Sequence, residues 1–194
     1  ISDRLSAVSF RRDMREACLH DEQKRKEDKT MEFLPNPKQM EYHTGHFLPG
    51  FQTKIVLCGT EPGAFLYAQM LQKELKEEAG LSLDILRALC PAESGDIVLC
   101  LDQKLEKDHY QLAIEEDKIS LVAGSDEALC NGVQTLCQVI QLHGAVLPCL
   151  SITDWPDLQN RGYYMDCSRG RVPKLSYLKE VADLLCRFKV NQWQ

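Results

Sequence analysis

Hydrophobic residues recur every three or four positions in three segments of the chain, and this spacing predicts three amphipathic helices. The first helix is expected over 62–79 and the second over 126–143. Ser125 precedes the second helix as a capping residue, and Gly144 follows it as a helix stop. The third helix is expected over 175–188, where one apolar stripe contains Leu175, Leu178, Val181, Ala182, Leu185 and Phe188.

Short apolar or alternating runs around the first two helices predict β-strands. The strongest signal is a hairpin over 109–124, in which Glu116–Lys118 form the turn and alternate residues on both sides are apolar. Strands and helices together predict an α+β fold, a largely antiparallel or mixed sheet with two helices on one face. The other expected strands lie at 53–59, 81–86, 96–102 and 145–150, after a weakly alternating run at 38–45.

The last part of the chain has a different order of elements. GYYMDCS (162–168) predicts a strand, the third helix follows, and VNQWQ (190–194) begins a second strand. A strand, a helix and a strand at this spacing indicate a right-handed parallel crossover. Eight such units build a TIM barrel, so we expect the first β/α unit of a truncated (β/α)8 barrel.

These patterns divide the chain into three parts. Residues 1–32 form a charged leader that we expect to be poorly ordered. Residues 33–151 form an α+β accessory domain, and residues 152–194 contain a linker and the first β-α-β segment of an incomplete barrel.

Composition narrows the range of partners and compartments. The net charge of −6 argues against binding to nucleic acid, and no apolar run approaches the ~18 residues of a membrane span. The nine cysteines include no C-x-x-C pair and are interpreted as free thiols in a reducing compartment. No signal peptide is visible, so the chain is predicted to be cytoplasmic, although trimming of its start leaves secretion open.

Two residues of the final segment are candidates for binding a substrate. Chemistry in barrels of this type lies at the C-terminal ends of the strands, where Asp166 is expected; capping the loop or the next helix is its alternative role. Arg161 lies at the start of the strand, where spacing favours a structural ion pair. Its guanidinium can still reach sugar hydroxyls if it points into the barrel.

Other polar clusters have simpler interpretations. His43 and His46 lack acids or cysteines at the spacing of metal ligands, so they are interpreted as surface or loop histidines. Asp154 and Asp157 flank Trp155–Pro156 in the linker and are interpreted as turn residues, not as an acid/base pair. The chain contains no nucleotide-binding motif, and we expect neither a cofactor nor a metal.

The run from 152 to 194 resembles the beginning of the catalytic barrel of glycoside hydrolase family 20, the β-N-acetylhexosaminidases. The shared pattern is I-x-D-x-P, then R-G-x-x-x-D-x-S-R, a helix, and K-x-N. FLPNPKQMEY (33–42) and the segment 108–140 resemble the accessory domain of the same family. The matching residues of the barrel pattern are Ile152, Asp154, Pro156, Arg161, Gly162, Asp166, Ser168, Arg169, Lys189 and Asn191.

The resemblance implies removal of a terminal β-linked N-acetylhexosamine, either GlcNAc or GalNAc, with retention. The substrate's own acetamido group serves as the nucleophile. The resemblance also implies that Arg161 holds hydroxyls of the terminal sugar, while Gly170 stands where many members have a histidine. The family's Asp–Glu pair orients the acetamido group and protonates the leaving oxygen. It lies on a later strand that this chain does not reach, and Asp84 and Asp117 do not replace it.

Three functions remain open from the sequence. The first is the N-terminal portion of a hexosaminidase, inactive alone and without a catalytic residue of its own. The second is a non-catalytic carbohydrate-binding or assembly module. The third is the accessory domain of another sugar hydrolase, against which the R-G-x-x-x-D-x-S-R run argues.

A truncated barrel also has a consequence for association. It predicts exposed apolar surface on the helix at 175–188 and an unpaired strand edge at 190–194. We therefore expect self-association through residues 175–194, or disorder of this segment.

Overall fold

The computed structural model describes residues 33–59, 62–88, 94–167, 170 and 172–194. Phe33–Gln194 form one compact unit. The prediction for the charged leader at 1–32 lies outside the described residues.

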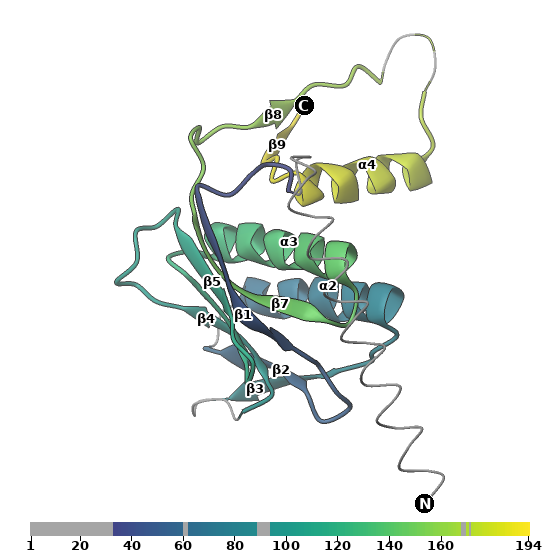
Figure 1. Cartoon of the computed structure of the whole chain (residues 1–194). Coiled ribbons are helices and arrows are strands. Elements are labelled where there is room, and N and C mark those ends of the chain that lie inside the picture. Colours follow the sequence, from purple (N-terminus) through teal and green to yellow (C-terminus); the bar gives the residue numbers. More distant parts are fainter. Residues whose placement is uncertain (1–32, 60–61, 89–93, 168–169, 171) are drawn as a thin grey trace, which may run out of the picture. The chain divides into compact units, whose positions relative to one another are not determined.

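A seven-stranded mixed sheet forms the centre of this unit (Figure 1), with strand order β1-β7-β5-β6-β4-β2-β3. The pairs β1–β7, β7–β5 and β5–β6 are antiparallel, whereas β6–β4, β4–β2 and β2–β3 are parallel. The α+β prediction is confirmed, and the antiparallel and parallel halves meet at β6. The strands are β1 (Gln39–Phe47), β2 (Lys54–Cys58), β3 (Asp84–Ala88), β4 (Ile97–Leu101), β5 (Tyr110–Ile114), β6 (Ile119–Ala123) and β7 (Leu147–Asp154).

Two helices pack on each other and on one face of this sheet (Figure 1). Helix α2 (Pro62–Ala79) contacts β2 and β3, and α3 (Asp126–His143) contacts β4 to β7. Ser125 caps α3 as predicted, because its hydroxyl accepts a hydrogen bond of 3.2 Å from the amide of Ala128. The hairpin and both helices therefore form where the sequence predicts them.

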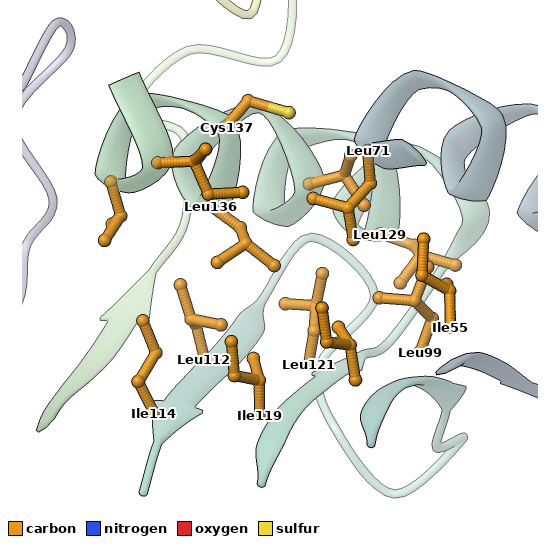
Figure 2. Close-up of a cluster of buried hydrophobic side chains, with 14 of the residues drawn as sticks. Ile55, Leu71, Leu99, Leu112, Ile114, Ile119, Leu121, Leu129, Leu136 and Cys137 are labelled. Carbon is orange, nitrogen blue, oxygen red and sulfur yellow. The ribbon is translucent and has the colours of Figure 1, made fainter. Parts of the chain in front are cut away.

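The core lies between the sheet and the two helices (Figure 2). Leu112 and Leu121 project from the hairpin toward Leu129 and Leu136 of α3, and all four side chains are buried. Alternate residues of the hairpin point to this face because successive side chains of a strand alternate sides. One continuous cluster thus fixes both helices on the sheet.

The last segment packs outside this core. Strands β8 (Gly162–Tyr163) and β9 (Gln192–Trp193) form a separate parallel pair, joined through α4 (Leu175–Arg187). The predicted strand over 162–168 is shorter in the structure, since β8 has a partner on one side alone. The parallel strand–helix–strand order is present, but the described residues build no barrel.

Helix α4 contains no buried residue, and the side chains of Leu175 and Leu184 are 68% and 52% exposed. The predicted exposed apolar surface is therefore present. Self-association through it remains a prediction. None of the described helices is long and apolar enough to cross a membrane.

Strand β7 is longer than predicted, and this changes the place of Asp154. The sequence predicts an end at 150, but the strand continues to Asp154 because β1 and β5 pair with it on both sides. Leu150, Ile152 and Asp154 occupy alternate, buried positions of this strand. The interpretation of Asp154 as a linker turn residue is wrong. A charged residue at an inward position ends the apolar alternation on which the prediction depends.

A close backbone contact at the end of β6 leads to the first prediction. A Cβ atom at Gly124 would lie 2.1 Å from the carbonyl oxygen of Glu106, and backbone cannot rotate away as a side chain can. We expect Gly124→Ala to lower the free energy of unfolding by about 1–3 kcal/mol, measured by urea denaturation. Gly50→Ala is the matched control, because no atom lies within 4 Å of its new Cβ. If Gly124→Ala and Gly50→Ala lower the free energy of unfolding equally, the close approach of Gly124 to the Glu106 carbonyl oxygen is contradicted.

Candidate functional site

A buried polar cluster joins the α+β domain to the last segment of the chain. Lys189, just after α4, places its Nζ atom 2.9 Å from Asp154 Oδ2 at the end of β7. The same Nζ atom donates to the hydroxyl of Tyr110 over 2.9 Å, and that hydroxyl donates to Asp154 Oδ2 over 2.8 Å. The side chains of Lys189 and Asp154 are only 7% and 8% exposed. Three elements that are distant in sequence thus meet at one carboxylate.

The remaining atoms of this cluster also have partners. Asp154 Oδ1 accepts a hydrogen bond of 3.1 Å from the backbone amide of Lys38. The Tyr110 hydroxyl lies 2.7 Å from Thr135 Oγ1 of α3, and Lys189 Nζ lies 5.1 Å from the centre of the Tyr110 ring. Buried charges are tolerated only when they are paired and hydrogen-bonded in this way.

Burial sets the protonation of the cluster. Desolvation lowers the pKa of Lys189, and the adjacent Asp154 carboxylate opposes this change by favouring the ammonium form. Desolvation and the same carboxylate raise the pKa of Tyr110 well above its ordinary value, so the phenol keeps its proton. Burial thus works against the charged form of Lys189, the contact with Asp154 works in favour of it, and the Tyr110 phenol stays neutral.

Arg161 lies beside this cluster and contacts three segments of the chain: the residues just before it, the residue Lys189 after α4, and the first turn of α3. Its Nε donates to the carbonyl oxygen of Lys189 over 2.7 Å, and one terminal nitrogen donates to the carbonyl of Leu158 over 2.6 Å. The other terminal nitrogen forms an ion pair of 3.1 Å with Glu127 Oε1 in the first turn of α3. Asn191 Nδ2 donates to the same Glu127 oxygen over 2.9 Å. Arg161 thus has the structural ion pair that its spacing favours, and its role as a sugar ligand remains a prediction.

A cavity of about 240 Å³ opens beside these groups. Trp155 forms part of its wall and stacks on His109, with ring centres 4.7 Å apart and planes inclined by 18°. An aromatic face combined with polar groups is a common lining for a small polar ligand. The cavity is lined by Pro35, Asn36, Lys38, Tyr110, Asn131, Asp154, Trp155, Pro156, Asp157, Leu158, Arg161 and Lys189.

Of the other candidate residues, Asp157 lines this cavity and Asp166 does not. Asp166 is exposed in the segment after β8, and it does not line the cavity; its role as a substrate ligand stays a prediction. Asp157, which the sequence places in a turn, forms a surface ion pair with Lys38. Ser168 and Arg169 of the barrel pattern lie outside the described residues.

The histidine pair at 43 and 46 lies on β1. His43 Nε2 is 3.0 Å from Ser151 Oγ on the neighbouring β7. Both histidines belong to a strand, and His43 is exposed on its surface, in agreement with the interpretation as surface or loop residues. Across the part of the chain that the structure describes, no three His, Cys, Asp or Glu side chains are placed to hold a metal ion.

One adjacent Asp–Glu pair does occur in the described residues, at Asp126–Glu127. Asp126 accepts a hydrogen bond of 3.1 Å from the Tyr67 hydroxyl, and Glu127 accepts from Arg161 and Asn191. Both acids lie in the first turn of α3, where negative charge favours the helix. These contacts connect the pair to α2 and to the last segment, and we interpret the pair as part of the N-terminal turn of α3.

Sequence reasoning misses the central group of the site. Lys189 is recognisable as the lysine of the K-x-N pattern, but its ion pair with Asp154 does not follow from that pattern alone. The family pattern does contain a signal for this pair. It has an aspartate in its I-x-D-x-P part, here Asp154, and a lysine in its K-x-N part, here Lys189. Charged residues that both belong to such a pattern are candidates for a pair.

Comparison with known proteins identifies the family. The sequence model described as "Glycosyl hydrolase family 20, domain 2" matches residues 30–155, more than half of the chain. The chain belongs to glycosyl hydrolase family 20. The α+β domain is the part that the family model covers, and the Lys189–Asp154 pair connects it to the residues that follow.

Two family 20 relatives show how far the similarity extends. A β-hexosaminidase of Vibrio furnissii is 28% identical over 166 residues, which are 84% of this chain and 25% of that protein. The crystal structure of a GH20 exo-β-N-acetylglucosaminidase of Vibrio harveyi with N-acetylglucosamine has a TM-score of 0.70 at 25% identity. The match covers 84% of this chain and 25% of that one. The chain therefore spans about a quarter of the length of these relatives.

A third structure supports the fold alone. The GH20 β-N-acetylhexosaminidase of Streptomyces coelicolor has a TM-score of 0.72 at 21% identity, over 84% of this chain and 34% of that one.

Proposed function

We propose that the chain is part of a glycoside hydrolase that removes terminal β-linked N-acetylhexosamine, GlcNAc or GalNAc, with substrate-assisted retention. In this role the α+β domain holds the first strand–helix–strand segment of the catalytic barrel in a fixed orientation. The observation that carries the proposal is the match of residues 30–155 to domain 2 of family 20. The motif R-G-x-x-x-D follows at 161–166 and is tied to the matched domain through Arg161.

The buried cluster supplies the physical reason for a fixed orientation. Lys189 belongs to the last segment, whereas Asp154 and Tyr110 belong to the sheet. Moving the last segment away would leave a carboxylate in a dry site without its cation, and such a state is strongly disfavoured. The accessory domain thus acts as a rigid support for the start of the barrel.

Arg161 is the residue proposed to contact the terminal sugar. A guanidinium carries five N–H groups. Arg161 donates to Lys189 O, Leu158 O and Gln159 O and to Glu127 among the described residues. One N–H of the nitrogen that faces Glu127 is left for a sugar hydroxyl. The ion pair with Glu127 would then hold the guanidinium in position for the substrate.

The chain by itself is proposed to be inactive. Its only described Asp–Glu pair is Asp126–Glu127, in which Asp126 Oδ2 and Glu127 Oε1 accept hydrogen bonds from Tyr67, Arg161 and Asn191. Among the described residues, no pair is left to orient the acetamido group and protonate the leaving oxygen.

We predict no turnover of a chromogenic N-acetylglucosaminide by the purified 194-residue chain above the rate in buffer. A whole family 20 enzyme in the same assay is the positive control. Measurable turnover that disappears in Asp126→Asn or Glu127→Gln would assign catalysis to this pair and overturn the proposal of inactivity.

Sugar binding is tested separately by NMR, through the side-chain Nε–Hε signals of two arginines during titration with N-acetylglucosamine. The Arg161 signal is expected to shift, whereas that of Arg87, an exposed residue of β3, is expected to stay unchanged. Shifts of equal size at both arginines would indicate a general effect of the sugar and would count against the proposed role.

A carbohydrate-binding module without catalysis is the second candidate, and the cavity beside Trp155 is the observation that favours it. The test is a truncated chain that ends at Leu158. A cut before Asp154 would remove part of β7, and Asp154→Asn should accompany the truncation because Lys189 is lost. Sugar binding that survives this truncation favours the module, and binding that is lost favours the role of Arg161.

A further inference from the structure

Two cysteines on different helices lie next to each other. Cys130 is on α3, in the α+β domain, and Cys186 is in the last turn of α4. Their sulfur atoms are 3.8 Å apart, and 56 residues separate them in sequence. A disulfide has an S–S length of about 2.05 Å, so the two sulfurs need to approach by less than ~2 Å. Both side chains are partly exposed and therefore accessible to a small oxidant.

The surroundings of the pair favour a reactive thiolate. The two thiols are within hydrogen-bonding distance, and this contact with Cys130 lowers the pKa of Cys186 to about 7. Gln134 Nε2 also donates to Cys186 Sγ over 3.4 Å and stabilises the same thiolate. Cys130 keeps the shared proton, so its own pKa is raised. The pair thus contains one nucleophilic thiolate and one adjacent thiol, as in dithiols that form disulfides.

We propose that Cys130 and Cys186 form a redox-controlled disulfide that fastens α4 to α3. The oxidant is a small disulfide such as oxidised glutathione. The Cys186 thiolate attacks one sulfur of glutathione disulfide, which gives a mixed disulfide and releases one glutathione thiolate. Cys130 then loses its proton and attacks Cys186 Sγ, which releases the second glutathione. Two protein thiols are oxidised, one glutathione disulfide is reduced, and the two thiol protons end on the two glutathiones.

The cross-link would join α4 to the α+β domain, to which this helix has few other side-chain contacts. Helix α4 has no buried residue, and its side-chain contacts to the domain include those of Arg187 with Glu74 at 3.5 Å and of Cys186 with α3. Lys189 anchors the chain just after α4, but the helix itself has few contacts with the domain, so it opens locally more easily than the core and exposes its backbone amides to exchange. Oxidation therefore changes the mobility of α4 more than that of the core.

The test is to equilibrate the chain with mixtures of reduced and oxidised glutathione, followed by mass spectrometry of the intact chain and of its peptides. We expect loss of two hydrogen masses and one cross-linked peptide pair that contains Cys130 and Cys186. Hydrogen exchange in residues 175–187 should slow by about tenfold or more in the oxidised chain, and dithiothreitol should reverse the change. Cys130→Ala should leave Cys186 as a mixed disulfide with one glutathione.

A matched control is available within the sheet. Cys58 and Cys100 occupy the same register on the parallel strands β2 and β4 and are also partly exposed. Cys58→Ser should leave the cross-link at Cys130 and Cys186 unchanged. The proposal is overturned if no cross-link forms at any glutathione ratio, if Cys130 or Cys186 bonds to another cysteine, or if α4 exchanges at the same rate in both states.

Reactivity provides an independent measurement. In the reduced chain, alkylation of Cys186 by iodoacetamide should reach half its maximal rate near pH 7, because the thiolate is the reacting form. Removing the proton donor in Cys130→Ala should move this midpoint toward the ordinary value of about 8.5. An unchanged midpoint would show that the two thiols do not share a proton and would remove the chemical basis of the proposal.

Discussion

Replacing Lys189 with methionine is expected to lower the free energy of unfolding by about 3–5 kcal/mol, since it leaves the Asp154 carboxylate buried without its cation. Methionine has a length close to that of lysine and fills the same space. Lys189 has a positive φ of 59°, which both residues would adopt with similar strain, so the comparison isolates the charge. The measurement is urea denaturation followed by circular dichroism, with the slope checked for two-state behaviour.

Two further variants test this explanation. Lys38→Met removes the ion pair with Asp157, whose side chain is 76% exposed, and should change stability by at most about 1 kcal/mol. The double variant Lys189→Met/Asp154→Leu removes both buried charges and should recover most of the loss. If Lys189→Met lowers the free energy of unfolding as little as Lys38→Met does, the Lys189–Asp154 pair does not behave as a buried, desolvated ion pair.

The same variant separates local from global effects. If the buried pair holds the last segment in place, Lys189→Met should increase hydrogen exchange in β8, α4 and β9 before it affects the sheet. The core beneath α3 does not include Lys189 and should keep its protection. The pair would then be a coupling between two parts of the protein rather than a feature of the core.

Most of the sheet and both of its helices could be predicted from the sequence because apolar residues there follow regular spacing. The hairpin at 109–124 is one example, in which every second residue is buried. Irregular elements were harder to predict. The weak alternation at 38–45 corresponds to β1, whose register shifts between Tyr42 and His46, where Gly45 has a φ of 104°. A bulge changes which side chains face inward and so obscures the pattern.

The site was less predictable than the fold, for a physical reason. Asp154 follows the alternation of β7, but a carboxylate at an inward position looks like the end of a strand when its partner is unknown. That partner, Lys189, is 35 residues away and belongs to another element. Spacing along one element cannot reveal a pair that forms between elements, whereas a family pattern that contains both residues can indicate it.

The family assignment and the geometry together favour a supporting role for the domain. The family model matches the α+β domain, while Arg161 and Asp166 belong to the segment that follows it. Arg161 contacts α3 through Glu127 and the last segment through the carbonyl of Lys189. The residue proposed to bind the sugar is therefore positioned by groups from both parts. This arrangement connects the proposed sugar ligand to the domain that the family model covers.

Replacing Leu121 with alanine is expected to lower the free energy of unfolding by about 2–5 kcal/mol, because it leaves a cavity in the centre of the core. Leu121 lies in the middle of β6, is fully buried, and faces α3 in Figure 2. The helix approaches the sheet closely at this point, since a Cβ atom at Gly132 would lie only 2.5 Å from Leu121 Cδ1. Gly132→Ala alone should therefore also destabilise the fold, by about 1–3 kcal/mol through overpacking.

The two substitutions are expected to compensate each other. When Leu121 is shortened to alanine, the methyl group that Gly132→Ala introduces enters space that the leucine occupied, and alanine also favours the helix over glycine by about 1 kcal/mol. The loss in the double variant should be smaller than the sum of the single losses by at least ~1 kcal/mol in a double-mutant cycle. Leu75→Ala combined with Gly132→Ala is the control, because no Leu75 atom is among the three nearest to the new Cβ. If the stability losses are additive in both double variants, the helix and the strand do not meet at Gly132. If the losses are non-additive only in the double variant of Leu121 and Gly132, this contact sets the spacing between α3 and the sheet.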